Sequence, residues 1–227
     1  DSVCHGLAAI YEMHSLRGEL AERDRKLKGG LVASIGALGA VVEMRDPFTA
    51  GHQRRVAKLA VAIGRELRLS DFQVEGLHLA SVVHDIGKIS VPAEVLCKTG
   101  VLSPAEFGII KEHPWHGHEA LRGIEYPWPI AQIILQHHER LDGSGYPKGL
   151  KGEQIVLEAA VLSVADVVEA MSSHRPYRPS LGIEAALSEI QDNKGRLYHT
   201  EAVEAAVGLF RVKGFYFTQG QTMLAVN

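Results

Sequence analysis

Two adjacent histidines close an apolar helical stripe near the middle of the chain. Ile130, Ile133, Ile134, His137 and His138 are spaced i, i+3, i+4, i+7 and i+8, so both histidines continue the face of a helix that should meet the core. One buried histidine is more often a hydrogen-bonded core residue than a metal ligand. Two in succession each leave a polar nitrogen that needs a partner, and a metal ion would serve both.

Other histidines and carboxylates occupy similar positions. His52 lies four residues before Val56, at the start of an apolar stripe, and His84 and Asp85 end another helix. Asp166 lies inside the apolar run 159–168, where burial of an uncompensated charge is costly. Because no Lys or Arg lies one helical turn from Asp166, its positive partner must come from elsewhere, and a metal ion is the simplest candidate.

The chemistry of these residues is that of a metal-dependent hydrolase. Imidazole nitrogens and carboxylate oxygens suit Fe or Mn foremost, and also accept Zn, Ni or Co. The candidates are too many for one tetrahedral site but fit two adjacent divalent metal ions bridged by a carboxylate, the arrangement that splits phosphate esters. One ion would bind the substrate phosphate while a hydroxide shared by both attacks phosphorus.

These residues fall in ordered motifs. The stretches RDPFTAGH (45–52), HDIGK (84–88) and HHERLDGSGYP (137–147), with VAD (164–166) and RPYR (175–178), resemble the HD-GYP family over roughly residues 45–208. The resemblance implies an all-α, HD-type helical bundle that hydrolyses cyclic di-GMP to pGpG and, in some members, on to GMP.

The resemblance also assigns the metal ligands residue by residue. One ion would be held by His52, His84, Asp85 and Asp166, and a second, bridged by Asp85, would be completed by His113, His137 and His138. By pattern alone His113 is hard to separate from His116 and His118, which we interpret as surface or supporting residues. Phe48 stands where the family's third-metal site has a glutamate, so we predict two ions rather than three.

Catalytic and substrate-contacting residues follow from the same motifs. Asp85 and Lys88 would be catalytic, with Lys88 beside the scissile phosphate; Gly145, Tyr146 and Pro147 would shape the pocket, and Arg175 and Arg178 would contact phosphate or guanine. Without the motifs, Lys88 would be a solvated helix-end cation and the arginines surface charges. Glu139 and Asp142 are expected to orient the histidines.

The positioning elements are all predicted to be helical, since no alternating strand pattern occurs. An amphipathic helix is expected at about 6–28, with loosely heptad-spaced Met13, Leu16, Leu20 and Leu27. It is equally compatible with a coiled-coil connector and with an ordinary surface helix. Gly29-Gly30 should interrupt it before a small-residue helix at 31–45. We expect a helical extension at 1–44, the phosphohydrolase domain at 45–213 and a tail at 214–227.

Bulk properties limit the partners. A net charge of −3 argues against a general nucleic-acid or membrane-surface binder. The small-residue apolar run 31–42 is shorter than the roughly 20 residues of a membrane span, and no signal peptide is visible. Two cysteines outside any CxxC pattern fit the cytoplasm. The first residue is Asp, so we expect a fragment driven by an upstream sensor or receiver domain, as a homodimer.

Two other functions remain open. A catalytically weak nucleotide-sensing or protein-interaction module is disfavoured by the complete ligand set, because a decayed site should have lost a ligand. A general His-Asp hydrolase of mononucleotides or alarmones is disfavoured by the paired His137-His138 and the GYP loop.

Overall fold

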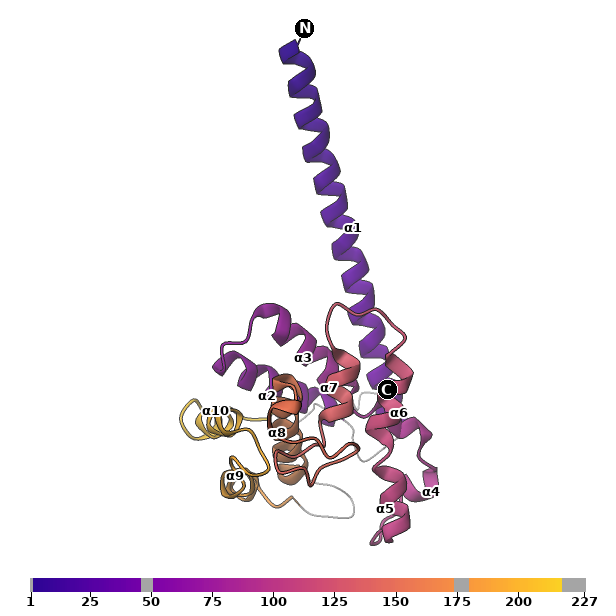
Figure 1. The fold of residues 1–227 in the computed structure, drawn as a ribbon, viewed down its shortest axis with the longest axis vertical. Coiled ribbons are helices and arrows are strands. Elements are labelled where there is room, and N and C mark those ends of the chain that lie inside the picture. Colours follow the sequence, from indigo (N-terminus) through magenta and orange to yellow (C-terminus); the bar gives the residue numbers. More distant parts are fainter. Residues whose placement is uncertain (1, 46–50, 174–179, 218–227) are drawn as a thin grey trace, which may run out of the picture.

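The chain folds entirely into helices and connecting loops. A computed structural model describes residues 2–45, 51–173 and 180–217, with side chains described from residue 13 onward. Within these residues no strand occurs, only two isolated bridges, and the predicted all-α fold is confirmed. The elements, drawn in Figure 1, are α1 (Ser2–Arg45), α2 (His52–Glu66), α3 (Asp71–Val83), η2 (Ile86–Ser90), α4 (Ala93–Leu96), α5 (Pro104–Ile110), α6 (His113–Leu121), α7 (Ile130–Gln136), η3 (Gly152–Gln154), α8 (Leu157–Ser172), α9 (Ile183–Asp192) and α10 (Thr200–Arg211).

The core lies where α2 packs between α3 and α8, and where α7 packs on α3. Apolar residues at helical spacing supply it: Leu59 and Ile63 on α2, Leu77 on α3, Ile133 on α7 and Leu162 on α8 are fully buried. Helix α8 is nearly apolar all round, so it runs through the middle of the domain. This places Asp166, halfway along α8, inside the protein.

Local signals set the helix ends. Ser70 accepts a hydrogen bond from the backbone N–H of Gln73, whose side chain returns to Ser70 N–H, which is a complete capping box at the start of α3. Ser103 and Glu106 form the same arrangement at α5. His113 begins α6, with Pro114 in the first turn, where its missing N–H costs little. The predicted cap Thr49 lies outside the described residues.

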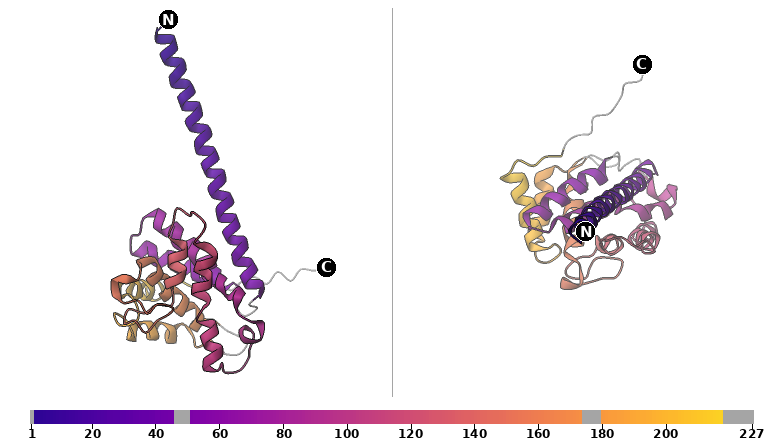
Figure 2. Two further views of the ribbon diagram at one scale, coloured as in Figure 1. Left: turned by 45° about the vertical axis from the view of Figure 1, so that its right-hand side comes forward. Right: turned by 90° about the horizontal axis from the view of Figure 1, so that it is seen from above.

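Helix α1 is a long rod that leaves the globular part, as the two views of Figure 2 show. Its C-terminal half packs on α3 and η2, where Ile35 and Val42 are buried. Lys28 pairs with Glu75 of α3 across 2.6 Å. Towards the N-terminus, Met13, Leu16, Leu20 and Leu27 are exposed.

One expectation about this helix is wrong, and a second rested on too short a stretch of sequence. α1 is continuous through Gly29-Gly30, because glycine in a helix costs only about 1 kcal/mol relative to alanine and does not forbid helical dihedrals. Within Met13–Arg45 an 18-residue stretch is long and apolar enough, by length and composition alone, to cross a membrane. The sequence criterion missed it by counting only the uninterrupted run 31–42. The core helix of a soluble protein meets the same criterion when it is mostly buried, but only 17% of this stretch is buried. A single helix of this kind is weak evidence for a membrane span.

The start of the predicted tail packs on α10. Phe215 N–H donates to the carbonyl of Leu209, and the rings of Phe215 and Phe217 lie 5.1 and 5.6 Å from that of Phe210 on α10. Phe210, Phe215 and Phe217 therefore form an aromatic cluster at the C-terminal end of α10.

Candidate metal centre

The seven predicted ligands meet at one place because each sits at a helix end or inside α8. His52 begins α2, His84 and Asp85 follow α3, His113 begins α6, His137 and His138 follow α7, and Asp166 lies on α8. Helices that pack on one another thereby bring five separate chain segments to a common point. All seven side chains are buried or nearly so.

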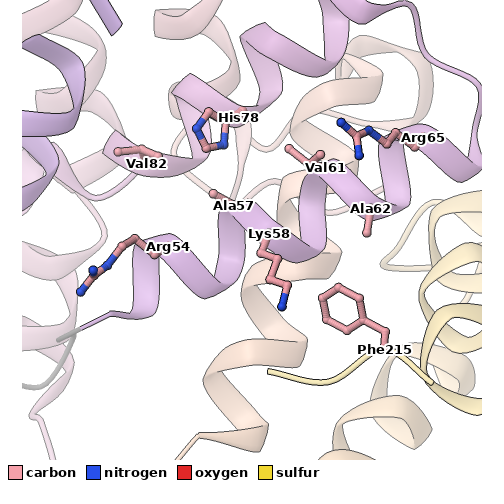
Figure 3. A pocket seen from close by; sticks show the side chains of 9 residues that line it. All are labelled: Arg54, Ala57, Lys58, Val61, Ala62, Arg65, His78, Val82 and Phe215. Atoms are coloured by element: carbon pink, nitrogen blue, oxygen red, sulfur yellow. The ribbon is translucent and has the colours of Figure 1, made fainter. Parts of the chain in front are cut away.

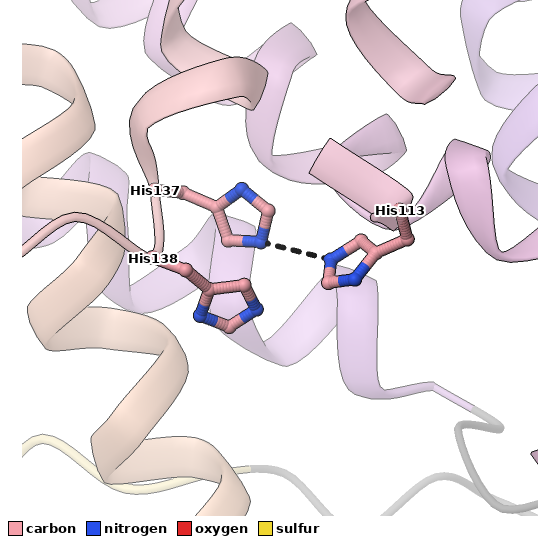
Figure 4. Close-up of side chains that lie close together, drawn as sticks. All are labelled: His113, His137 and His138. Carbon is pink, nitrogen blue, oxygen red and sulfur yellow. Dashed lines mark hydrogen bonds between the residues drawn. The ribbon is translucent and has the colours of Figure 1, made fainter. Parts of the chain in front are cut away.

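The ligand atoms form three overlapping groups, in each of which the atoms lie within 4.8 Å of one another. The groups are His52, His84 and Asp85; His84, His137 and Asp166; and His113, His137 and His138. Figure 4 shows the last group, with the rings of all three histidines turned towards each other and 3.4 Å between the Nε2 atoms of His113 and His137.

Asp85 lies between two halves of this cluster. Its Oδ1 is 3.3 Å from His113 Nε2, while its Oδ2 is 3.5 Å from His84 Nε2 and 4.0 Å from His52 Nε2. Asp166 Oδ1 is 3.2 Å from His52 Nε2 and 3.8 Å from His84 Nε2. A carboxylate whose two oxygens face different histidine groups has the geometry of a bridge between two cations.

Three histidines are oriented by the turn that precedes them. The Nδ1 of His84, His113 and His137 lies 2.8, 2.8 and 2.6 Å from the carbonyl oxygen three residues earlier, in Ser81, Ile110 and Ile134. Since a carbonyl only accepts, each Nδ1 carries the proton and each Nε2 presents a lone pair to the cluster. These are the tautomers that metal ligands need.

A buried lone pair without a donor supports the same conclusion. Among the described residues, His84 Nε2 is fully buried and has no hydrogen-bond partner. Leaving such an atom unsatisfied costs roughly 1–3 kcal/mol, and a cation would remove that cost. Imidazole lone pairs with two carboxylates form a donor set that fits a divalent metal ion.

Electrostatics divides the histidines into two kinds. Burial lowers the pKa of His113 to about 4 and that of His137 to about 3, so both are neutral near pH 7. Burial also tends to lower the pKa of His52. Its hydrogen bonds with Asp166 and Glu169 outweigh that effect, and the pKa rises to about 9. Burial raises the pKa of Asp85, yet Lys88 and the surrounding histidines hold it well below its usual range. Near pH 7 His113 and His137 are therefore neutral and Asp85 is ionised, whereas His52 is protonated and must lose a proton to bind a metal ion.

Lys88, the predicted catalytic lysine, lies at the edge of this cluster. Its Nζ is 2.8 Å from Asp85 Oδ2, and its side chain is largely buried. Gly87 makes room for this arrangement, because a Cβ there would lie 1.9 Å from the carbonyl oxygen of His113. That close approach of η2 to α6 is what brings Asp85 and His113 together.

Glu139 and Gly145 fix the conformation of the loop that follows His138. We expected Glu139 to orient a histidine. Instead its buried carboxylate accepts hydrogen bonds from the N–H groups of Lys148 and Leu150, at 2.7 and 2.9 Å, and so orders the loop. Asp142 likewise binds Ser144 N–H. A Cβ at Gly145 would lie 2.4 Å from Glu139 Cα. This packing sets the Tyr146 ring 4.8 Å from that of His138, with Pro147 following.

Sequence reasoning missed Glu169, which supports His52. Glu169 is fully buried, bonds His52 Nδ1, and accepts from Arg55 Nε and Ser173 Oγ, both at 2.6 Å. A carboxylate behind a ligand histidine fixes its ring and raises its basicity. Its signal was available: Glu169 lies three residues after Asp166 and directly follows the apolar run 159–168, so it falls on the same helix and near the same face as Asp166.

The remaining predicted residues lie apart from the cluster or outside the description. His116 and His118 are partly exposed and belong to none of the three groups. Phe48, Arg175 and Arg178 lie outside the described residues. A separate groove between α2, α3 and the C-terminal segment is lined by Arg54, Lys58, Arg65, His78 and Phe215 and includes no cluster residue (Figure 3).

Several known proteins have sequences similar to this chain. A family model described as HD domain matches residues 37–201, which include all seven cluster residues. The chain is 39% identical over 189 residues to the cyclic di-GMP phosphodiesterase response regulator RpfG of Xanthomonas campestris pv. campestris, covering 82% of this chain and 48% of that protein. It is 41% identical over 174 residues to a cyclic di-GMP phosphodiesterase of Thermotoga maritima, covering 76% and 47%.

Another relative is named for a different substrate. A 3'3'-cGAMP-specific phosphodiesterase 3 of Vibrio cholerae is 36% identical over 159 residues, covering 70% of this chain and 35% of that protein. A solved structure of the cyclic GMP-AMP specific phosphodiesterase V-cGAP3 of V. cholerae shares 29% identity, with a TM-score of 0.51, covering 78% and 40%. The chain spans about half the length of the first two relatives.

Proposed function

The chain belongs to the HD domain family and carries HD-GYP motifs, and we propose that it is a metal-dependent phosphodiesterase that hydrolyses cyclic di-GMP to pGpG, the product that some HD-GYP members convert further to GMP. The observation that carries the proposal is Asp85, whose two carboxylate oxygens face two different groups of histidines. The named relatives support the substrate class.

The proposed centre holds two divalent cations, Fe or Mn by preference. The ligands of the first would be His52, His84, Asp85 and Asp166, and those of the second Asp85, His113, His137 and His138. When bound, such a pair polarises the phosphodiester and makes a water molecule nucleophilic near neutral pH.

The chain's own residues would orient the reactants. The carbonyl bonds behind His84, His113 and His137 fix the direction of their lone pairs. Lys88, 2.8 Å from Asp85, is placed to donate to a phosphate oxygen of a bound substrate and to offset its developing charge. Tyr146, beside His138, would offer a stacking face, and Gly145 and Pro147 would shape that wall. Arg175 and Arg178 remain proposed contacts to phosphate or guanine.

The direct test is anaerobic purification, metal analysis, and incubation with cyclic di-GMP or 3'3'-cGAMP, followed by chromatography. We expect two equivalents of Fe or Mn, and pGpG as the first product. His137→Ala should abolish turnover, whereas His14→Ala, on the exposed part of α1, should not. A protein loaded with two metals that binds cyclic di-GMP without cleaving it would favour the sensing module instead.

We also propose the wider organisation: residues 1–44 as a connector to an upstream sensor or receiver domain, 45–213 as the phosphodiesterase domain, and 214–227 as a tail, with the chain acting as a cytoplasmic homodimer. The exposed heptad residues Met13, Leu16, Leu20 and Leu27 support pairing along α1. Light scattering should give a dimer, and Leu20→Glu with Leu27→Glu should give a monomer. Recovery of the protein in the membrane fraction would instead favour a membrane role for α1.

A further inference from the structure

A concavity of about 640 Å³ lies beside the proposed metal centre, and Tyr146 and Pro147, the proposed wall of the substrate pocket, form one side of it. It is lined by α6 and the segment before it on one side, and by the loop after His138 on the other. Lys111, Glu112, Trp115, Tyr146 and Lys148 are the lining residues that matter here.

This concavity shares a wall with the metal centre. The Tyr146 ring lies beside that of His138, with centroids 4.8 Å apart, and it also lies 5.4 Å from Lys111 Nζ. Lys111 and Glu112 immediately precede the cluster residue His113. A ligand whose phosphate reaches the metal centre can therefore place its neighbouring group in the concavity.

The lining suits a nucleotide base. Trp115 is 44% exposed, although tryptophan is usually mostly buried. His118 stacks against the indole at 5.9 Å, and Lys148 Nζ lies 6.0 Å above the ring. Aromatic faces flanked by lysines bind bases by stacking and the linking phosphates by charge. Here two aromatics, Trp115 and Tyr146, stand with two lysines around one hollow.

Glu112, which also lines this concavity, would favour guanine over adenine. It lies three residues before Trp115, on the same side of the chain, and its carboxylate is 3.5 Å from His116 Nε2. Guanine presents two adjacent donors, N1–H and the N2 amino group, which a carboxylate can accept together. Adenine presents an acceptor at N1, which a carboxylate repels.

We propose that this concavity is a base subsite in which Trp115 stacks on a guanine of the cyclic dinucleotide and Glu112 selects guanine over adenine. The inference rests on the proposed function for the identity of the substrate. The base subsite adds Glu112 to the proposed function as a residue that sets substrate specificity. Relatives of this chain are named for cyclic di-GMP or for 3'3'-cGAMP, so such a residue would matter among them.

Fluorescence gives a test that needs no turnover. The chain has two tryptophans, and the other, Trp128, is buried. We expect GMP to quench the emission of the full-length protein, AMP to quench it more weakly, and Trp115→Phe to lose the quenching. Emission that GMP leaves unchanged, or quenching that survives in Trp115→Phe, would overturn the subsite.

Kinetics tests the same subsite on the substrate. Trp115→Ala should raise KM for cyclic di-GMP about ten-fold, as expected for one lost stacking contact, with Trp115→Phe restoring most of it. Glu112→Gln should lower the preference for cyclic di-GMP over 3'3'-cGAMP about ten-fold. Tyr216→Ala, an exposed aromatic outside this concavity, is the matched control. An unchanged KM in Trp115→Ala, with its circular dichroism intact, would refute the stacking role.

The two proposals fail differently. If the wild type cleaves neither cyclic dinucleotide but GMP quenches Trp115, the phosphodiesterase assignment falls and the base subsite stands. If cyclic di-GMP is cleaved but neither variant changes KM or selectivity, the subsite falls and the phosphodiesterase assignment stands.

Discussion

Replacing Glu169 with glutamine tests whether the metal centre depends on support from behind a ligand. Glu169 is fully buried and accepts from three donors: His52 Nδ1, Arg55 Nε and Ser173 Oγ. Burial raises the pKa of Glu169, but its bonds from His52 and Ser173 and the charge of Arg55 lower it to about 2, so the group is ionised at neutral pH. Glutamine keeps the shape, removes the charge, and turns an N–H group towards a donor.

The magnitude follows from the loss of a charge-assisted hydrogen bond to a ligand histidine. Changes of this kind cost roughly 10- to 100-fold in metal affinity, which is about 1.4–2.7 kcal/mol. We expect the metal content of purified Glu169→Gln to fall, with His52 the ligand affected, and Glu169→Asp to recover only part of it because its side chain is shorter.

The assay is competition for Mn between the protein and a chelating dye, with plasma mass spectrometry for the bound metal. Glu158→Gln is the matched control, since Glu158 lies on the same helix and accepts from Gln73, away from the cluster. If Glu169→Gln binds two metal ions as tightly as the wild type, His52 does not depend on this carboxylate and the reasoning is refuted.

Three further perturbations have definite expected outcomes. Gly87→Ala should reduce turnover of cyclic di-GMP at least 100-fold, because the added Cβ would collide with the His113 carbonyl. Gly108→Ala has open space around the added Cβ and should leave turnover unchanged. Chromatography of the products measures turnover in both variants. Removing metal with a chelator should lower the melting temperature, because buried histidine lone pairs lose their partner, and Mn should restore it; calorimetry after metal return checks this. Ile133→Ala should lower the free energy of unfolding by about 2–5 kcal/mol through a core cavity, against less than about 1 kcal/mol for the exposed Ile124→Ala, as measured by urea denaturation.

The sequence was informative where one residue could be judged by its own helix. His137 and His138 continued an apolar stripe, and Asp166 stood in an apolar run, so burial and the need for a partner followed directly. His113 could not be separated from His116 and His118 in that way. The three lie within six residues, and only the start of α6 and the Ile110 carbonyl decide which ring enters the cluster.

What pattern alone could not supply were relations between helices. Glu169 supports a histidine 117 positions earlier in the chain, across the packing of α2 on α8. Trp115 gains its neighbour Lys148 only when the loop after His138 folds back towards α6. Gly29-Gly30 was misjudged for the opposite reason: local propensity predicted an interruption, but the cost of two glycines is small beside that of ending a long helix.

Helix α1 is long and contacts the elements next to the metal centre, so it connects its distant N-terminal end with that centre. Its 44 residues span about 66 Å at the usual helical rise, and its last turns bear on α3 and η2, the two elements that flank His84 and Asp85. Arg45, at its end, also donates to the Val91 carbonyl just beyond η2. Because α1 contacts both α3 and η2, a displacement of its N-terminal end would act directly on the segments that carry His84 and Asp85.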